Sequence, residues 1–172
     1  MKKHFRAGSF LAVLLAGCAA AAQASNPEAS VAQKLKVGAD ESLAMIAAAK
    51  GVQIYECRAG EWAFVAPEAE LFDASGKPIG RHYAGPSWEA VDGSKIVGSV
   101  TASAAAPDAV AIPWLLLGAK SVGPAGTFSQ VSTVRRVHTR GGMAPVSGCF
   151  AATAGTVERS PYTADYYFFT KE

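Results

Sequence analysis

The sequence predicts a mainly β domain, an antiparallel β-sandwich or barrel with one short N-terminal helix. Seven or eight short β-prone segments follow one another from residue 52 to the C-terminus, and turns rich in Gly and Pro separate them. This pattern is typical of antiparallel sandwiches and barrels. A chain of 172 residues is long enough for one domain with a single hydrophobic core.

The first residues have the pattern of an export signal. Lys2, Lys3 and Arg6 precede an apolar run over residues 7–17. This run is shorter than the roughly 20 residues that a membrane-spanning helix needs, and it fits the apolar part of a secretory signal peptide. We therefore expect the chain to be exported.

Two alternative signal-peptide cleavage sites are present at the end of the apolar run and just after it. Residues 15–18 (Leu-Ala-Gly-Cys) form a lipobox, in which Cys18 is acylated and becomes the new N-terminus. Residues 22–24 (Ala-Gln-Ala) form a site for ordinary signal peptidase. Because the lipobox follows the apolar run directly, we expect a lipoprotein signal over residues 1–17, with residues 1–24 as the alternative.

The segment after Cys18 predicts a tether to the membrane. Residues 18–36 are rich in Ala, Ser and Gln and carry few apolar anchors, which is typical of a flexible linker before a single β-rich domain over residues 37–172. Ala19 follows the cysteine, which favours the outer membrane, with the periplasm or the exterior as alternatives. The lipid on Cys18 makes the membrane the expected partner.

The charge of the mature chain argues against a nucleic-acid partner. Residues 1–17 hold three of the 16 basic residues and none of the 14 acidic ones, which leaves a net charge of about −1. Nucleic-acid-binding domains usually present a basic patch or stripe instead. We therefore expect no nucleic acid to bind.

Cysteine usage agrees with export. Cys57 and Cys149 remain as an even pair once Cys18 is lipidated or removed. In an oxidising envelope a disulfide between them is the default expectation. Two free buried thiols are the alternative.

The short helix is predicted over residues 40–50. Asp40 can cap its start, Lys50 lies in its last turn, and Gly51 can adopt the left-handed conformation that ends many helices. Three apolar residues fall on one helical face, namely Leu43, Ile46 and Ala47.

Strand signals follow the helix. Residues 52–58 and 62–65 form a hairpin with one aromatic face, and Pro67 either ends the second strand or places it at an edge. A strand is then expected over residues 79–83, ended by a Gly-Pro turn.

The clearest hairpin joins residues 88–91 to residues 95–101. Its turn contains Asp92 and Gly93, a pair that suits a type I′ turn. A loop is expected over residues 102–110, where small residues surround a proline.

Three further strands complete the domain. Residues 112–119 form a continuous apolar run that predicts a strand buried on both faces, although a short buried helix fits too. Residues 127–139 repeat apolar side chains every three positions, but their β-branched residues favour a strand. Residues 162–170 predict an aromatic final strand.

Four motifs give the chain a family resemblance. They lie at residues 51–57 (G-x-Q-x-Y-x-C), 82–88, 112–115 and 161–167. With these motifs, residues 35–172 resemble the family called domain of unknown function 3455, whose members are exported proteins of bacteria and fungi. The resemblance implies export and a mostly β domain. It implies no activity and transfers no catalytic residue, because the family has no assigned chemistry.

The densest group of polar and aromatic side chains lies in residues 81–89, around a Gly-Pro turn. A histidine, two large aromatic residues and a carboxylate in one segment are typical of a ligand-binding pocket. We therefore expect a non-catalytic domain that binds a small molecule or partner here. The candidate ligand-binding residues are His82, Tyr83, Trp88, Glu89, Trp114, Arg135 and Asp165.

Two other interpretations remain open. In one, the chain is a secreted hydrolase that uses His82 and a carboxylate, although no G-x-S-x-G motif is present. In the other, the aromatic residues only fill the core and the chain is a structural envelope protein.

We expect neither a metal nor a cofactor. His82 and His138 lack the close spacing of a local metal motif. No G-x-G-x-x-G motif follows a predicted strand and opens a helix, so no dinucleotide site is predicted.

Overall fold

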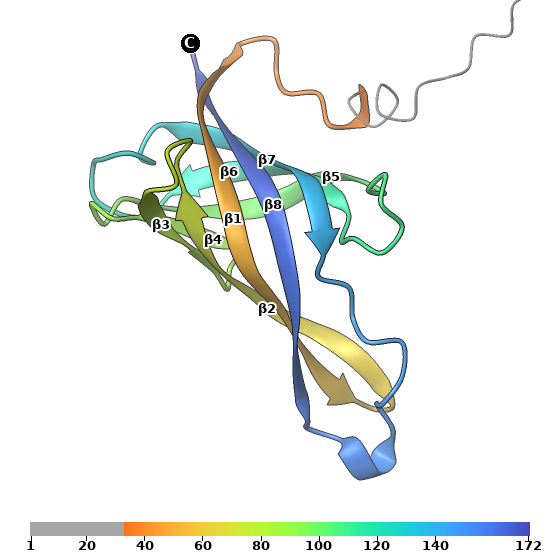
Figure 1. The fold of residues 1–172 in the computed structure, drawn as a ribbon. Coiled ribbons are helices and arrows are strands. Elements are labelled where there is room, and N and C mark those ends of the chain that lie inside the picture. The colour runs from red at the N-terminus through yellow and green to blue at the C-terminus, as the bar shows by residue number, and fades with distance from the viewer. Residues whose placement is uncertain (1–32) are drawn as a thin grey trace, which may run out of the picture.

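The computed structural model describes residues 33–172, which form a closed eight-stranded antiparallel β-barrel (Figure 1). Each strand pairs with the next along the chain, and β1 pairs with β8 to close the barrel. The mainly β, antiparallel fold is confirmed, in its barrel form. The elements are β1 (Glu41–Arg58), β2 (Glu61–Phe72), β3 (Pro78–Tyr83), β4 (Ser87–Ala90), β5 (Lys95–Ala104), β6 (Trp114–Ser121), β7 (Val131–Gly141), the 3-10 helix η1 (Ala151–Thr153) and β8 (Val157–Lys171).

The expected signal peptide, the lipidation site at Cys18 and most of the expected tether lie outside the described residues. Leu35, near the end of that tether, is buried in a small cluster with Ala104, Trp114 and Val137 on the outside of the barrel. No helix within residues 33–172 is long and apolar enough to cross a bilayer.

The helix expected over residues 40–50 is wrong, because these residues form the first half of β1. Ala47 and Ala49 alternate toward the interior, whereas Leu43 and Ile46 are exposed. Pairing with β8 and β2 thus overrides the helical preference of an alanine-rich segment. Gly51 is not a helix cap but a point of close strand contact, since a Cβ there would lie 2.0 Å from the carbonyl oxygen of Glu68.

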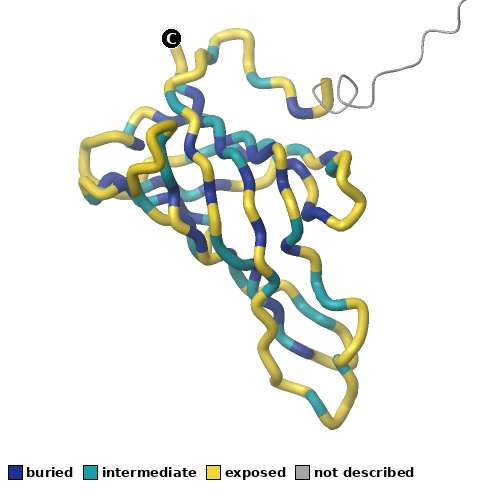
Figure 2. The backbone as a smooth tube through the Cα atoms, in the orientation of Figure 1, coloured by how far each residue is buried: buried dark blue, intermediate teal, exposed yellow. Residues whose placement is uncertain are grey.

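Large aromatic side chains fill the barrel interior opposite these small residues. Trp88 of β4 meets Tyr166 of β8 edge to face at 5.5 Å, and Phe168 stacks on Phe128 at 4.8 Å. Buried and exposed residues alternate along β1 and β8 (Figure 2), as expected when one side of each strand faces a packed interior.

The hairpin between β4 and β5 is confirmed, but its turn is not type I′. Only Gly93, with φ +83°, has a positive φ, whereas a type I′ turn needs Asp92 to have one as well. The amide of Gly93 donates to the carbonyl oxygen of Ala90 instead. The Asp92 carboxylate accepts four hydrogen bonds, from the amide and hydroxyl of both Ser94 and Thr127, and so joins this turn to the loop before β7.

Two other strands differ from the expectation. β6 is not buried on both faces, since only Trp114 and Leu117 are buried along its length. β2 continues through Pro67 to Phe72, but it pairs with β3 only from Ala69 onward. Pro67 therefore lies where β2 is an edge strand, which suits a residue without an amide hydrogen.

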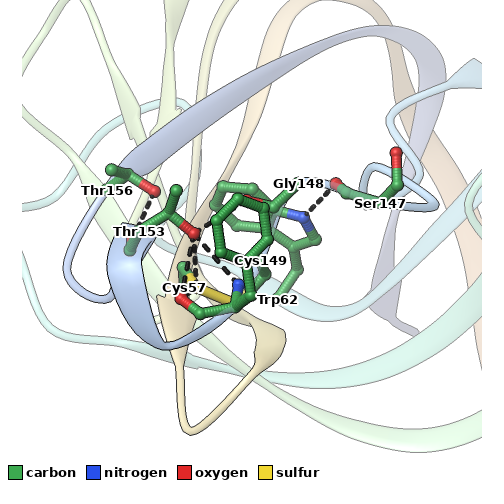
Figure 3. The surroundings of a disulfide bond; sticks show 8 residues. Cys57, Trp62, Ser147, Gly148, Cys149, Thr153 and Thr156 are labelled. Carbon is green, nitrogen blue, oxygen red and sulfur yellow. Dashed lines mark hydrogen bonds between the residues drawn. A yellow bond between two sulfur atoms is a disulfide. The ribbon is translucent and has the colours of Figure 1, made fainter.

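The lower parts of β1, β2 and β8 extend beyond the barrel as an arm, with η1 at its tip (Figure 1). The expected disulfide joins Cys57 of β1 to Cys149 at this tip. Trp62 lies beside the disulfide and donates its Nε1 hydrogen to the carbonyl oxygen of Ser147 at 2.9 Å (Figure 3). The bridge therefore ties the β7–β8 connection to the β1–β2 hairpin.

Replacing both cysteines, in the variant Cys57→Ser/Cys149→Ser, is expected to lower the free energy of unfolding by about 4–5 kcal/mol. The reason is that the bridge closes a loop spanning 92 positions, which restricts the unfolded chain. Urea unfolding with and without a thiol reductant measures this. Reductant should destabilise the wild type and leave the double variant unchanged, and a wild type insensitive to it would contradict the prediction.

Candidate functional site

A partly enclosed pocket of about 300 Å³ leads into the barrel beside the β3–β4 turn. Its walls are apolar and come from β2, β5, β6 and the turn, for example Val65, Val100 and Pro86. Polar and aromatic side chains line it as well, namely Gln53, His82, Trp88, Arg136 and Tyr166. Apolar walls with a few polar groups are the usual composition of a small-molecule site.

A larger hollow of about 520 Å³ lies on the outside of the barrel, but it has a different character. Its charged side chains include Glu68 and Arg159, which form an ion pair at 2.7 Å and are both about half exposed or more. These two charges are thus already neutralised by each other and solvated by water. The interior pocket is the better candidate site.

Strand alternation decides which side chains of β3 and β4 enter the pocket. His82 is paired with Trp88 across the two strands, and the neighbouring pair is Arg81 with Glu89. Since successive side chains point to opposite faces, the first pair lies inside the barrel and the second outside. The rings of His82 and Trp88 stack with centroids 4.5 Å apart.

The indole ring of Trp88 packs closely against Gly98 of β5. A Cβ on Gly98 would lie only 2.7 Å from Cζ3 of the indole ring. The ring can therefore approach the backbone of β5 this closely only because residue 98 has no side chain. This close approach leaves room in the barrel interior for the pocket that the ring lines.

His82 is a neutral group at physiological pH. Its ring is 2% exposed, and burial lowers its pKa to about 3, with the charge of Arg136 acting in the same direction. Its Nδ1 lies 2.8 Å from the carbonyl oxygen of Ser87. Because a carbonyl only accepts, Nδ1 carries the hydrogen and Nε2 keeps a lone pair.

Arg136 brings a positive charge into the barrel. Its Nε and Nη2 donate to the carbonyl oxygen of Pro113, at 3.2 and 2.8 Å. Within residues 33–172 it forms no ion pair with a carboxylate, and its other neighbour in the pocket is the neutral hydroxyl of Tyr166. Burial raises the pKa of Tyr55 and Tyr166, and the Arg136 charge opposes that shift at both. The pocket therefore contains a buried cation without a counter-charge.

Two neutral donors in the pocket also lack acceptors. Gln53 of β1 is 3% exposed, and its Nε2 has no hydrogen-bond partner in the described part of the chain. The Nε1 of Trp88 is equally unpartnered there. A buried donor without an acceptor costs free energy, so such groups are rare in folded proteins. The pocket therefore combines two unused donors, on Gln53 and Trp88, with the positive charge of Arg136.

The structure divides the residues expected to bind a ligand. His82 and Trp88 line the pocket, but Tyr83 and Glu89 lie on the outer face of the barrel. There the Tyr83 hydroxyl donates to Glu89, and Arg81 pairs with the same carboxylate at 2.8 Å. Residues 81–89 thus do not form one site. His82 and Trp88 contribute to the pocket, whereas Arg81, Tyr83 and Glu89 form a separate cluster on the outer surface.

The other three expected residues also lie outside. Arg135 stacks over the rings of Tyr167 and Phe169, at 5.2 and 5.1 Å. Asp165 pairs with Nδ1 of His138 at 2.8 Å, and Trp114 is buried in the outer cluster that contains Leu35. None of the three is among the pocket-lining residues, so the structure does not bring them together with His82 in this pocket.

The arrangement expected of a hydrolase does not form around His82. Glu89 lies on the opposite face of the sheet, and no carboxylate in residues 33–172 hydrogen-bonds to the His82 ring. The hydroxyl of Ser87 donates to the carbonyl oxygen of Ala84. The described residues also contain no group of three or more side chains placed to share a metal ion.

Two polar pocket residues, Gln53 and Arg136, are not among the candidate residues expected from the sequence. Gln53 belongs to the G-x-Q-x-Y-x-C motif, where it alternates with Tyr55 and Cys57 on the buried side of β1. That alternation was a usable signal, because a glutamine in register with buried residues is placed in an interior.

Stability is expected to fall as pH falls below about 6.5, because the unfolded histidine binds a proton that folded His82, with a pKa of about 3, does not. From pH 7 to pH 5 this amounts to about 2 kcal/mol of unfolding free energy. Urea unfolding of the wild type and His82→Gln over this range measures it. The variant should show a shallower pH dependence, and equal slopes would contradict the assignment.

Comparison with known proteins places the chain in a family but supplies no activity. No curated protein and no solved structure is significantly similar to it. One family model matches residues 38–170, which is most of the chain and almost the whole barrel. The chain therefore belongs to the domain of unknown function 3455 family, described as "Protein of unknown function (DUF3455)".

Proposed function

We propose that this chain is an exported, non-catalytic binding protein whose barrel pocket holds a small, largely apolar molecule. The observation that carries the proposal is the pocket of about 300 Å³, with apolar walls, unused donors on Gln53 and Trp88, and the charge of Arg136. Such a combination is favourable for a ligand that covers apolar surface and supplies acceptors. A purely structural domain, whose aromatic residues only filled the core, would need neither an open pocket nor a buried cation.

Binding is favoured over catalysis by the groups around the pocket. The Nδ1 of His82 is engaged by a backbone carbonyl, and Glu89 and Asp165 point away from the pocket. Acid–base catalysis by a histidine usually relies on a partner that orients the ring and stabilises its charged form. A neutral His82 next to Arg136 suits recognition instead.

The proposed location is the cell envelope. The leader over residues 1–17 and the lipobox cysteine Cys18 support a lipid anchor in the outer membrane, with a soluble periplasmic or secreted form as the alternative. The Cys57–Cys149 bridge fits an oxidising compartment. In this proposal the membrane is a partner through the lipid, and the barrel is the part that binds.

An uncharged fluorescent probe, N-phenyl-1-naphthylamine, is expected to bind the mature protein saturably. The variant Val100→Trp should weaken binding about tenfold or more, because Val100 lines the pocket mouth and is 56% exposed, so a larger side chain can cover the opening. Val91→Trp is the matched control, since Val91 is 77% exposed and does not line the pocket. No saturable binding, or equal loss in both variants, would contradict the proposal.

A further inference from the structure

We infer that the molecule held in the barrel pocket is a monocarboxylate, with one carboxylate on an apolar body, and that Arg136 and Gln53 bind the carboxylate. This inference rests on the proposed function, since it names the class of molecule that the same pocket takes. It is carried by a guanidinium without a carboxylate partner among the described residues and an amide donor without an acceptor, which line one pocket and belong to side chains more than nine-tenths buried.

The unpaired charge is the first step of the argument. Buried charges in proteins are normally paired, because a charge taken out of water without a partner is costly. Arg136 is 8% exposed, and the carbonyl oxygen of Pro113 receives two of its five N–H groups. A carbonyl dipole satisfies these hydrogens but leaves the net charge uncompensated. An anion is therefore the missing partner.

The unused hydrogen-bond donors indicate where the anion binds. The guanidinium of Arg136 has more N–H groups than the two that Pro113 accepts, and Nε2 of Gln53 has no acceptor among the described residues. Both side chains line the same pocket. A carboxylate has two oxygens that each accept more than one hydrogen bond. Hydrogen bonds between a charged donor and a charged acceptor are also the strongest kind in proteins. One carboxylate can therefore use both donors.

The charge balance favours a carboxylate over a phosphate. Among the described residues that line the pocket, Arg136 is the single charged side chain. His82 adds no second positive charge, since burial keeps it neutral. A phosphate monoester carries a charge of about −1.5 to −2 and would leave excess negative charge against apolar walls. A carboxylate matches the single guanidinium.

The apolar walls of the pocket indicate the chemistry of the rest of the ligand. From the polar inner end to the mouth they consist mostly of apolar side chains, including Val65, Leu115 and Leu117. At the mouth, Phe64 and Val100 remain more than half exposed. Burying such surface is favourable in proportion to its area. A hydrocarbon or aryl body extending from the carboxylate toward the mouth would cover it.

Isothermal titration calorimetry of the mature protein tests the inference, with octanoate, octanamide and octyl phosphate as ligands. These share one chain and differ in the head group. We expect octanoate to bind roughly 10- to 100-fold more tightly than octanamide, the range for hydrogen bonds to a charged group, and more tightly than octyl phosphate. Equal affinities for octanoate and octanamide, or stronger binding of octyl phosphate, would overturn the inference.

Three variants assign the preference to particular residues. Arg136→Gln should abolish it, and Gln53→Leu should reduce it several-fold while leaving the unfolding temperature unchanged or higher, because it removes an unpaired buried donor. Arg135→Gln is the matched control, since this neighbouring arginine lies on the outer face over Tyr167 and Phe169. It should keep the full preference for octanoate.

Failure of the inference and failure of the proposed function give different results. If the neutral probe binds in the pocket but octanoate shows no advantage over octanamide, the inference fails and the proposed function stands. If neither the probe nor any octyl compound binds saturably, both fail. Arg136→Gln could fail to fold, because the carbonyl of Pro113 would lose its donors. In that case Gln53→Leu is the variant that tests the inference. An unchanged preference for octanoate in Gln53→Leu would overturn the role of Gln53 and the inference with it.

Discussion

The pairing of β1 with β8 closes the barrel, and the pocket exists because of it. The ladder extends from Glu41, opposite Lys171, to Glu56, opposite Val157, so the first and last strands are joined along nearly their full length. Closure pairs the first strand with the last and creates an interior. It places Gln53 of β1 in the same enclosure as side chains that come from β3, β4 and β7.

The interior combines a well-packed aromatic part with a polar part that is incompletely satisfied. Trp88 packs edge to face against both Tyr166 and Phe168, and all three belong to the main hydrophobic cluster. Beside them, Arg136 donates to the backbone carbonyl of Pro113 but has no carboxylate partner among the described residues, and Gln53 has a free donor. A domain selected for stability alone would gain by replacing such groups with apolar ones. Their presence is therefore best explained by something that binds them.

Local patterns in the sequence predict most of the strands, because turn residues and alternation are local signals. The segment at residues 40–50 was misjudged because an alanine-rich strand becomes stable only through partners that are distant in sequence. The site could be predicted only in part, since alternation separates His82 from Glu89 although both lie in one segment. Choosing Arg136 over Arg135 was not possible, because apolar residues flank both and a bulge near His138 (φ 51°) breaks the alternation.

Gly98 affects the volume of the pocket without lining it. Its missing side chain sets how far the indole of Trp88 can retreat from the pocket, although Gly98 itself is not among the pocket-lining residues. A larger residue at this position would push the ring inward and shrink the available volume. In the proposed function, β5 thus sets the volume available to the ligand, whereas β1 and β7 supply the groups proposed to bind its carboxylate. A substitution at residue 98 would therefore change the size of ligand accepted without changing the groups that bind its polar end.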